Sequence, residues 1–220
     1  MASTIAALTT GGGGIATSAD ASGNLSLLSG ATTVVAVTST GATVTGTLAA
    51  TGAITGSSTV AGSTGILYPL TSGTAVASTS GTAITFTSIP SWVKRVTIML
   101  QGVSGSSSAT LYMQIGSGSL TTSGYLGGGS YLTVYAGINA NTYFPLEGAA
   151  LSAAAVRHGT FVLTNITGNT WVMSGLQNNS NDSGASIANG SLALSGVLDR
   201  VSIAISAGTF DAGSINILYE

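Results

Sequence analysis

The sequence predicts an all-β protein on three observations. Short runs of alternating apolar and polar residues recur through its second half, glycine, serine and asparagine separate these runs, and no stretch keeps a helical period over several turns. Strands with one apolar face pack together as sandwiches or jelly rolls. We therefore expect residues 66–220 to form a β-sandwich, jelly-roll-like head domain, preceded by a short N-terminal stalk of β repeats.

Strands of the head are expected wherever the alternation is clear. In chain order, the alternating positions are Ile84 and Phe86; Val96, Ile98 and Leu100; Leu111, Met113 and Ile115; Tyr131, Thr133 and Tyr135; Phe161 and Leu163; Trp171 and Met173; Val201, Ile203 and Ile205; and Ile215, Ile217 and Tyr219. Residues 165–169 are expected as the five-residue loop of a hairpin. Residues 149–156 form the one segment with a weak helical pattern.

Charged and aromatic residues are distributed unevenly along the chain. Only ten residues are charged, 5% of the chain, against roughly 25% in an ordinary soluble domain. Asp20 is the one charge within residues 1–93, and the first aromatic residue is Tyr68. Aromatic side chains usually dominate a globular core, at about 150–250 Å² buried each. The first 65 residues therefore lack the material for a core of their own.

A ten-residue repeat suggests how this segment becomes ordered. TVTGTLAATG, from position 43, is followed by AITGSSTVAG, so that aliphatic and glycine positions recur in register. Short β units of this kind bury their apolar side against neighbouring units, and two units are too few unless other chains supply more. We expect residues 1–30 to be an attachment segment and 31–65 an intertwined stalk, with a trimer core at Val44, Leu48, Ile54 and Val60. The alternative is a flexible Gly/Ser/Thr linker after a frayed terminus.

Several segments carry a family resemblance. The VTGTL and TGAITG repeats, IPSWVKRVTIMLQGVS from position 89, GTFVLTNITGNTWVMSG from 159 and the final LDRVSIAISAGTFDAGSINILYE resemble tailed-bacteriophage fibre proteins. The resemblance implies a homotrimeric virion structural protein, assembled in the host cytoplasm and anchored to capsid or tail proteins through its N-terminal segment. Tail fibres, head fibres and capsid decoration proteins belong to this class. The chain is short for a long tail fibre and has no long repeat array, so a short fibre or a cement-like decoration protein fits at least as well.

Composition argues against several other classes. A net charge of −2 gives no basic cluster for nucleic acid. Mean hydropathy is high, at +0.53, yet no window holds the roughly 20 consecutive apolar residues of a membrane span. The first ten residues have neither the basic nor the apolar region of a signal peptide. We expect neither nucleic-acid binding nor membrane insertion.

The sequence offers little catalytic or metal-binding chemistry. His158 is the one histidine and cysteine is absent, so neither a catalytic triad nor a zinc site is expected, and we expect His158 on the surface or in a turn. The carboxylates Glu147, Asp182, Asp199 and Asp211 form no local pair for glycoside hydrolysis. Asp199-Arg200 is expected as a turn or an ion pair, and residues 181–184 as a polar turn rather than a cation site. Neither enzyme activity nor a cofactor is expected.

Tyrosines suggest one binding hypothesis. Tyr125, Tyr131, Tyr135 and Tyr143 lie within twenty residues in a glycine-rich region. Aromatic rings at a surface stack on sugars or fill protein interfaces; the alternative interpretation is a core or subunit contact. The alternative function is therefore a receptor-binding fibre tip that recognises a host-surface carbohydrate. A polysaccharide-degrading tailspike is a third class, disfavoured by the scattered carboxylates.

Overall fold

The computed structural model describes residues 25–29, 32–38, 41–45, 60–62, 65–67, 70–132, 136–181 and 184–220. Within these residues there is no helix, and every strand pairing is antiparallel. The all-β prediction is confirmed at this level. The chain divides into two compact units, Met1–Thr59 and Val60–Glu220.

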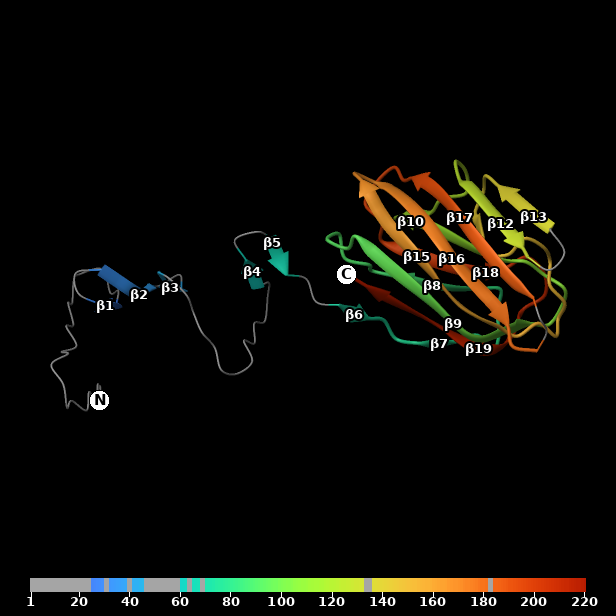
Figure 1. Ribbon diagram of the computed structural model, residues 1–220, viewed down its shortest axis with the longest axis horizontal. Coiled ribbons are helices and arrows are strands. Elements are labelled where there is room, and N and C mark those ends of the chain that lie inside the picture. The colour runs from blue at the N-terminus through green and yellow to red at the C-terminus, as the bar shows by residue number, and fades with distance from the viewer. Residues whose placement is uncertain are drawn as a thin grey trace. The chain divides into compact units, whose positions relative to one another are not determined.

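The N-terminal unit contains one small sheet (Figure 1). Its strands are β1 (Leu25–Ser29), β2 (Thr32–Thr38) and β3 (Gly41–Val44), in the order β1-β2-β3. The β-branched run of β2 forms the central strand, as its residue types favour. Val35 pairs directly with Val44 across β2 and β3. Val35 is half-buried, while Val44 is 37% exposed.

The C-terminal unit begins with a short hairpin and contains two larger sheets (Figure 1). The hairpin joins β4 (Val60–Gly62) to β5 (Gly65–Leu67). The five-stranded sheet has the order β11-β10-β18-β8, and β14 also pairs with β10. Its strands are β8 (Ala83–Thr87), β10 (Leu111–Ser117), β11 (Ser119–Leu120), β14 (Phe144–Pro145) and β18 (Arg200–Ile205).

The nine-stranded sheet has the order β13-β12-β17-β16-β15-β9-β19-β6, and β7 also pairs with β19. Its strands are β6 (Thr71–Ser72), β7 (Val76–Ala77), β9 (Arg95–Gly105), β12 (Leu126–Tyr131), β13 (Ala136–Ala140), β15 (Arg157–Thr167), β16 (Thr170–Asn179), β17 (Ala185–Ala193) and β19 (Phe210–Tyr219). β13 forms one edge of this sheet.

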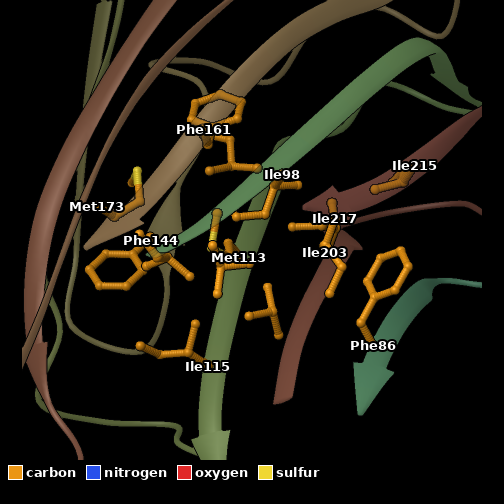
Figure 2. Packing of buried hydrophobic residues seen from close by; sticks show 14 of the residues in the cluster. Phe86, Ile98, Met113, Ile115, Phe144, Phe161, Met173, Ile203, Ile215 and Ile217 are labelled. Carbon is orange, nitrogen blue, oxygen red and sulfur yellow. The ribbon is translucent and has the colours of Figure 1, made fainter. Parts of the chain in front are cut away.

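One hydrophobic core draws residues from both large sheets. In β9 the buried residues are Val96, Ile98 and Leu100, while Thr97 and Met99 between them stay partly exposed, as a period of two requires. Figure 2 shows the result. Apolar side chains of the nine-stranded sheet converge on those of the five-stranded sheet; the labelled ones are Ile98, Phe161, Met173, Ile215 and Ile217 from the first and Phe86, Met113, Ile115, Phe144 and Ile203 from the second.

Three local expectations differ from the structure. The hairpin between β15 and β16 is present, but its connection is Gly168-Asn169 instead of five residues, because the pairing continues past a bulge as far as Thr167. Tyr131 ends strand β12 instead of beginning one, and residues 133–135 lie outside the described residues. Residues 149–156 contain a bridge at Leu151 and a turn, not a helical turn.

Candidate functional site

Three consecutive glycines form the middle of β12. Glycine weakens a strand and often marks a place where another backbone comes close. A Cβ atom on Gly127 would lie 2.9 Å from Cδ of Pro145, and one on Gly129 would lie 2.4 Å from the carbonyl oxygen of Glu147. Both glycines are buried. Residues 143–148 therefore lie directly against the inner face of β12, where no larger residue would fit.

Gly128 faces the opposite way, towards the outer face of the sheet. It pairs directly with Asn139 of β13 on one side and with Asn189 of β17 on the other. Because neighbouring strands lie about 4.8 Å apart, the two asparagines stand roughly 10 Å apart across a floor that has no side chain. Both asparagines are exposed, and within the described part of the chain neither side-chain amide has a hydrogen-bond partner.

A hollow of about 700 Å³ surrounds this floor. Its lining is Tyr125, Leu126, Gly127, Gly128, Asn139, Ala140, Asn141, Thr142, Tyr143 and Asn189. Tyr143 forms a firm wall because its ring packs on Tyr112, with ring centroids 4.6 Å apart. The adjoining loop is fixed as well: Gln114 Nε2 donates to the Thr142 carbonyl at 3.0 Å.

Two further hollows, of about 370 Å³ and 300 Å³, continue along β12. The first shares Gly128, Asn139 and Asn189 with the larger hollow, and the second shares Ser130, Gly137 and Ile187 with the first. Together the three hollows form what we call the amide groove, which follows β12 from Leu126 to Leu132. Among the described residues, none that lines it is charged. The 700 Å³ of its widest hollow falls within the range of small-molecule sites.

A buried ion pair lies on the inner side of the same strand. Glu147 is 0% exposed and Arg157, the first residue of β15, is 1% exposed. Arg157 Nε donates to Glu147 Oε1 at 3.0 Å, and the Leu111 amide donates to the same oxygen at 2.5 Å. The two remaining Arg157 nitrogens donate to the carbonyls of Ala155 and Ala109, at 3.3 Å and 3.2 Å. The guanidinium therefore ties three segments together.

The Glu147 carboxyl is less well satisfied than its partner. Its Oε2 atom has no hydrogen-bond partner among the described residues, nor have the two polar side-chain atoms of Gln177. Burial raises the pKa of Glu147 to about 7, although Arg157, the Leu111 amide and the nearby Gln177 amide favour the charged form. The desolvation cost of a buried carboxylate is large enough to outweigh several such contacts.

Two of the four predicted tyrosines line the 700 Å³ hollow. Tyr143 contributes its partly exposed ring, whereas Tyr125 is only 1% exposed. The single proton of the Tyr125 hydroxyl is shared within the core between the carbonyls of Thr121, at 3.0 Å, and Ile115, at 3.2 Å, and the hydroxyl oxygen accepts from the Ile115 amide at 3.0 Å. Burial raises the pKa of Tyr125 to about 12. Its ring is therefore closed to a ligand.

Tyr131 lies at the far end of the groove, where a Cβ atom on Gly184 would overlap its hydroxyl oxygen. Tyr135 lies outside the described residues. The same holds for Leu48, Ile54 and Asp182, and the side chain of Val60 is not described.

The predicted polar residues outside the groove are dispersed. His158 lies in β15, where its Nδ1 accepts from the Gly102 amide at 3.3 Å. Asp199 pairs with Arg200 at 2.8 Å, and Asp211 accepts a hydrogen bond from Ser104 Oγ. Within the described residues, no three histidine, cysteine, aspartate or glutamate side chains come together in a way that could hold a metal ion.

Sequence reasoning did not find the residues that shape the groove. Asn139 and Asn189 look like two of many polar residues, because their proximity depends on both pairing with Gly128. The one available signal was the run Gly127-Gly128-Gly129. Consecutive glycines within a strand often mark a place where another backbone or a ligand comes close. The buried pair was hidden in the same way, because Glu147 and Arg157 are ten residues apart in the sequence and only the fold brings their charged groups together.

Comparison with protein-family models, with curated proteins and with solved structures gave no match. Within the described residues, no helix is long and apolar enough to cross a membrane.

Proposed function

We propose that the chain is a non-enzymatic structural protein of a bacteriophage particle: a homotrimeric short fibre or decoration protein on the virion surface. Its N-terminal segment, residues 1–30, would grip a capsid or tail protein, residues 31–65 would form a stalk, and residues 66–220 would form an exposed β-sandwich head. The support is the family resemblance of the sequence together with one feature of the N-terminal sheet.

That feature is the exposed Val44 of β3, which stands opposite the half-buried Val35 of β2. Val44 is 37% exposed although it stands directly opposite Val35. Within the described residues, the sheet that holds both consists of three short strands. Three strands with a hydrophobic face are about the smallest sheet that is stable by itself in water, so a sheet of this size that leaves a valine exposed would gain stability from further apolar cover. Two more copies of the chain would supply that cover, because the aliphatic residues of each copy would meet at a common axis.

The low charge of the chain is consistent with such an assembly. Burying a charged group in an interface costs free energy unless the charge is paired. The only charged side chain in residues 1–65 is that of Asp20. Serine, threonine and glycine can be buried between identical chains at a lower cost.

Analytical ultracentrifugation of the full chain tests the trimer. We expect a trimer at micromolar concentration, and we expect Val44→Asp to weaken it, because each trimer would bury three carboxylates. Val197→Asp is the matched control, since Val197 is a valine with 51% exposure in the C-terminal unit. A parent protein that sediments as a folded monomer would contradict the proposal, and so would a Val44→Asp variant as trimeric as the control.

The virion role needs a separate test. Cryo-electron microscopy of phage particles from the source of the gene, with labelled antibody against this chain, should place it on the capsid or the tail. Particles that carry none of the chain would overturn the virion role even if the protein is a trimer.

A further inference from the structure

We propose that the amide groove is a binding site for an uncharged carbohydrate, held between Asn139 and Asn189 over the bare floor of Gly128. This inference goes beyond the virion role and does not depend on it. Four properties of the groove carry it: its shape, its polar groups, its lack of charge and its rigidity.

The shape comes from the glycine floor. A Cβ atom on Gly128 would lie 3.2 Å from Asn139 Oδ1, so any larger residue at this position would fill the space between the two amides. The three adjoining hollows extend along seven residues of chain, from Leu126 to Leu132, which corresponds to about 20 Å of strand. An elongated, open groove suits a chain of sugar units better than a compact metabolite.

The polar groups match hydroxyls. Each asparagine side chain offers two N–H donors and a carbonyl acceptor, a combination that can bind two neighbouring sugar hydroxyls at once. A site whose polar groups await hydroxyls also discriminates strongly against ligands that lack them. Neither amide has a partner within the described residues, so both are free to bind without breaking an existing bond.

The lack of charge decides between ligand classes. Phosphate, sulfate and acidic sugars are recognised by arginine or lysine, and among the described residues no cation lines the groove. Apolar ligands are disfavoured too, because the widest part presents amides, a threonine and backbone polar groups. A neutral, hydroxyl-rich chain fits what remains.

The groove is also built rigidly, which lowers the entropy cost of binding. Its floor and two walls are strands β12, β13 and β17, paired in continuous register. The Tyr143 wall is supported by Tyr112 at 4.6 Å, and the Tyr125 amide donates to the Asn141 carbonyl at 3.1 Å. Tyr143 adds an aromatic face beside the amides, against which the C–H side of a sugar ring can pack.

A glycan array tests the proposal. The full chain is applied to neutral hexose and N-acetylhexosamine oligosaccharides, printed beside sialylated and sulfated forms of the same sugars. We expect binding to a subset of the neutral oligosaccharides and weaker binding to the charged forms. Asn139→Ala and Asn189→Ala should each weaken the binding about 10-fold or more, the range for losing a hydrogen bond or two, and Gly128→Val should abolish it.

Asn178→Ala is the matched control, because Asn178 is an exposed asparagine of β16 that does not line the groove. It should bind as the parent does. Thermal unfolding and sedimentation of each variant show whether the fold and the oligomeric state are intact. Gly128→Ser is a smaller change, used if the valine variant fails to fold, and it should still weaken binding.

Three results would overturn the proposal. The parent chain could bind no neutral oligosaccharide on the array, the folded Gly128 variants could bind as strongly as the parent, or the groove variants could change the oligomeric state, which would make the groove a contact between subunits. A trimer that binds no sugar would refute this inference alone, whereas a monomer that binds sugar would refute only the proposed trimer.

Discussion

The Glu147–Arg157 and Asp199–Arg200 ion pairs are built from the same groups in opposite surroundings. Both join an arginine Nε to a carboxylate oxygen, at 3.0 Å and 2.8 Å. The first pair is buried to within 1% of full burial, whereas the Asp199 and Arg200 side chains are 37% and 26% exposed. Burial raises the pKa of Glu147, while the hydrogen bond from Arg200, with the Gly118 amide, lowers the pKa of Asp199.

The surroundings of a carboxylate therefore decide whether it supports the folded state. Water solvates the Asp199 carboxylate, so Arg200 has only to add to that solvation. The Glu147 carboxylate has lost its water, and Arg157 replaces only part of it, because Oε2 is left without a hydrogen-bond partner. We therefore expect the two pairs to differ in how much stability depends on them and in how that stability varies with pH.

Removing the buried cation should have the largest effect. Arg157→Met keeps an unbranched side chain of similar length but leaves Glu147 without a counter-ion. It also removes one hydrogen-bond donor from the Ala155 carbonyl and one from the Ala109 carbonyl, which keeps the bond from the Leu151 amide. Breaking one side of a buried pair costs about 3–5 kcal/mol, so the free energy of unfolding at pH 8, measured with denaturant, should fall by about that amount. The loss should be smaller at pH 5.5, where the lone carboxyl takes up a proton.

Arg200→Met is the control for that experiment. Its partner Asp199 can turn to water, so the denaturant midpoint should stay close to that of the parent protein. If Arg157→Met were no more harmful than Arg200→Met, burial would not distinguish the two pairs.

The pH dependence of stability gives a second, smaller effect. The pKa of Glu147 rises from 4.5 to about 7 on folding, so between these pH values the folded state holds a proton that the unfolded state has released. The free energy of unfolding should therefore fall as pH rises from about 4.5 to 7, by about 3 kcal/mol, and then level off. Glu147→Gln, which has the same shape and no charge, should remove this slope; a slope equally steep in the variant would contradict the assignment to Glu147.

The smallest effect is expected at Asp199, and it has the opposite sign. Because the folded-state pKa is lowered, the stabilisation is present above the unfolded-state value of 3.8 and is lost as pH falls through the folded-state value. Asp199→Asn keeps an oxygen for the Gly118 amide but removes the charge. We expect the variant to be slightly less stable than the parent at pH 7, measured as the difference between their denaturant midpoints. High salt should reduce this difference, because it screens the exposed ion pair of the parent. A loss comparable to that of Arg157→Met would contradict the comparison.

Sequence reasoning predicted the fold where one strand carries its own pattern. In β9, the apolar residues Val96, Ile98 and Leu100 alternate with polar or partly exposed residues. This pattern predicts both the strand and the face that it buries. β12 has no such pattern, because Gly127 and Gly129 are buried without an apolar side chain. The strand was therefore missed until Tyr131, its last residue.

The candidate site was harder to predict because it depends on register. Asn139 and Asn189 are fifty residues apart, and only their common pairing with Gly128 brings them together. Tyr143 was predicted as a site residue, because a group of tyrosines in a glycine-rich region is visible in the sequence itself. Tyr125 was found for the same reason, but residue type alone does not separate a tyrosine that lines a groove from a core tyrosine whose hydroxyl proton is shared between the Thr121 and Ile115 carbonyls.

The glycine strand β12 also sets how this protein can vary. A substituent on Gly127 or Gly129 would collide with residues 143–148, whereas one on Gly128 would point into the groove. Substitutions should thus be tolerated at Gly128 but not at Gly127 or Gly129 on either side of it. A substitution at Gly128 can alter what the groove accepts without disturbing the ion pair on the inner side of the strand. A single substitution would therefore change the ligand of the protein while its core stays the same.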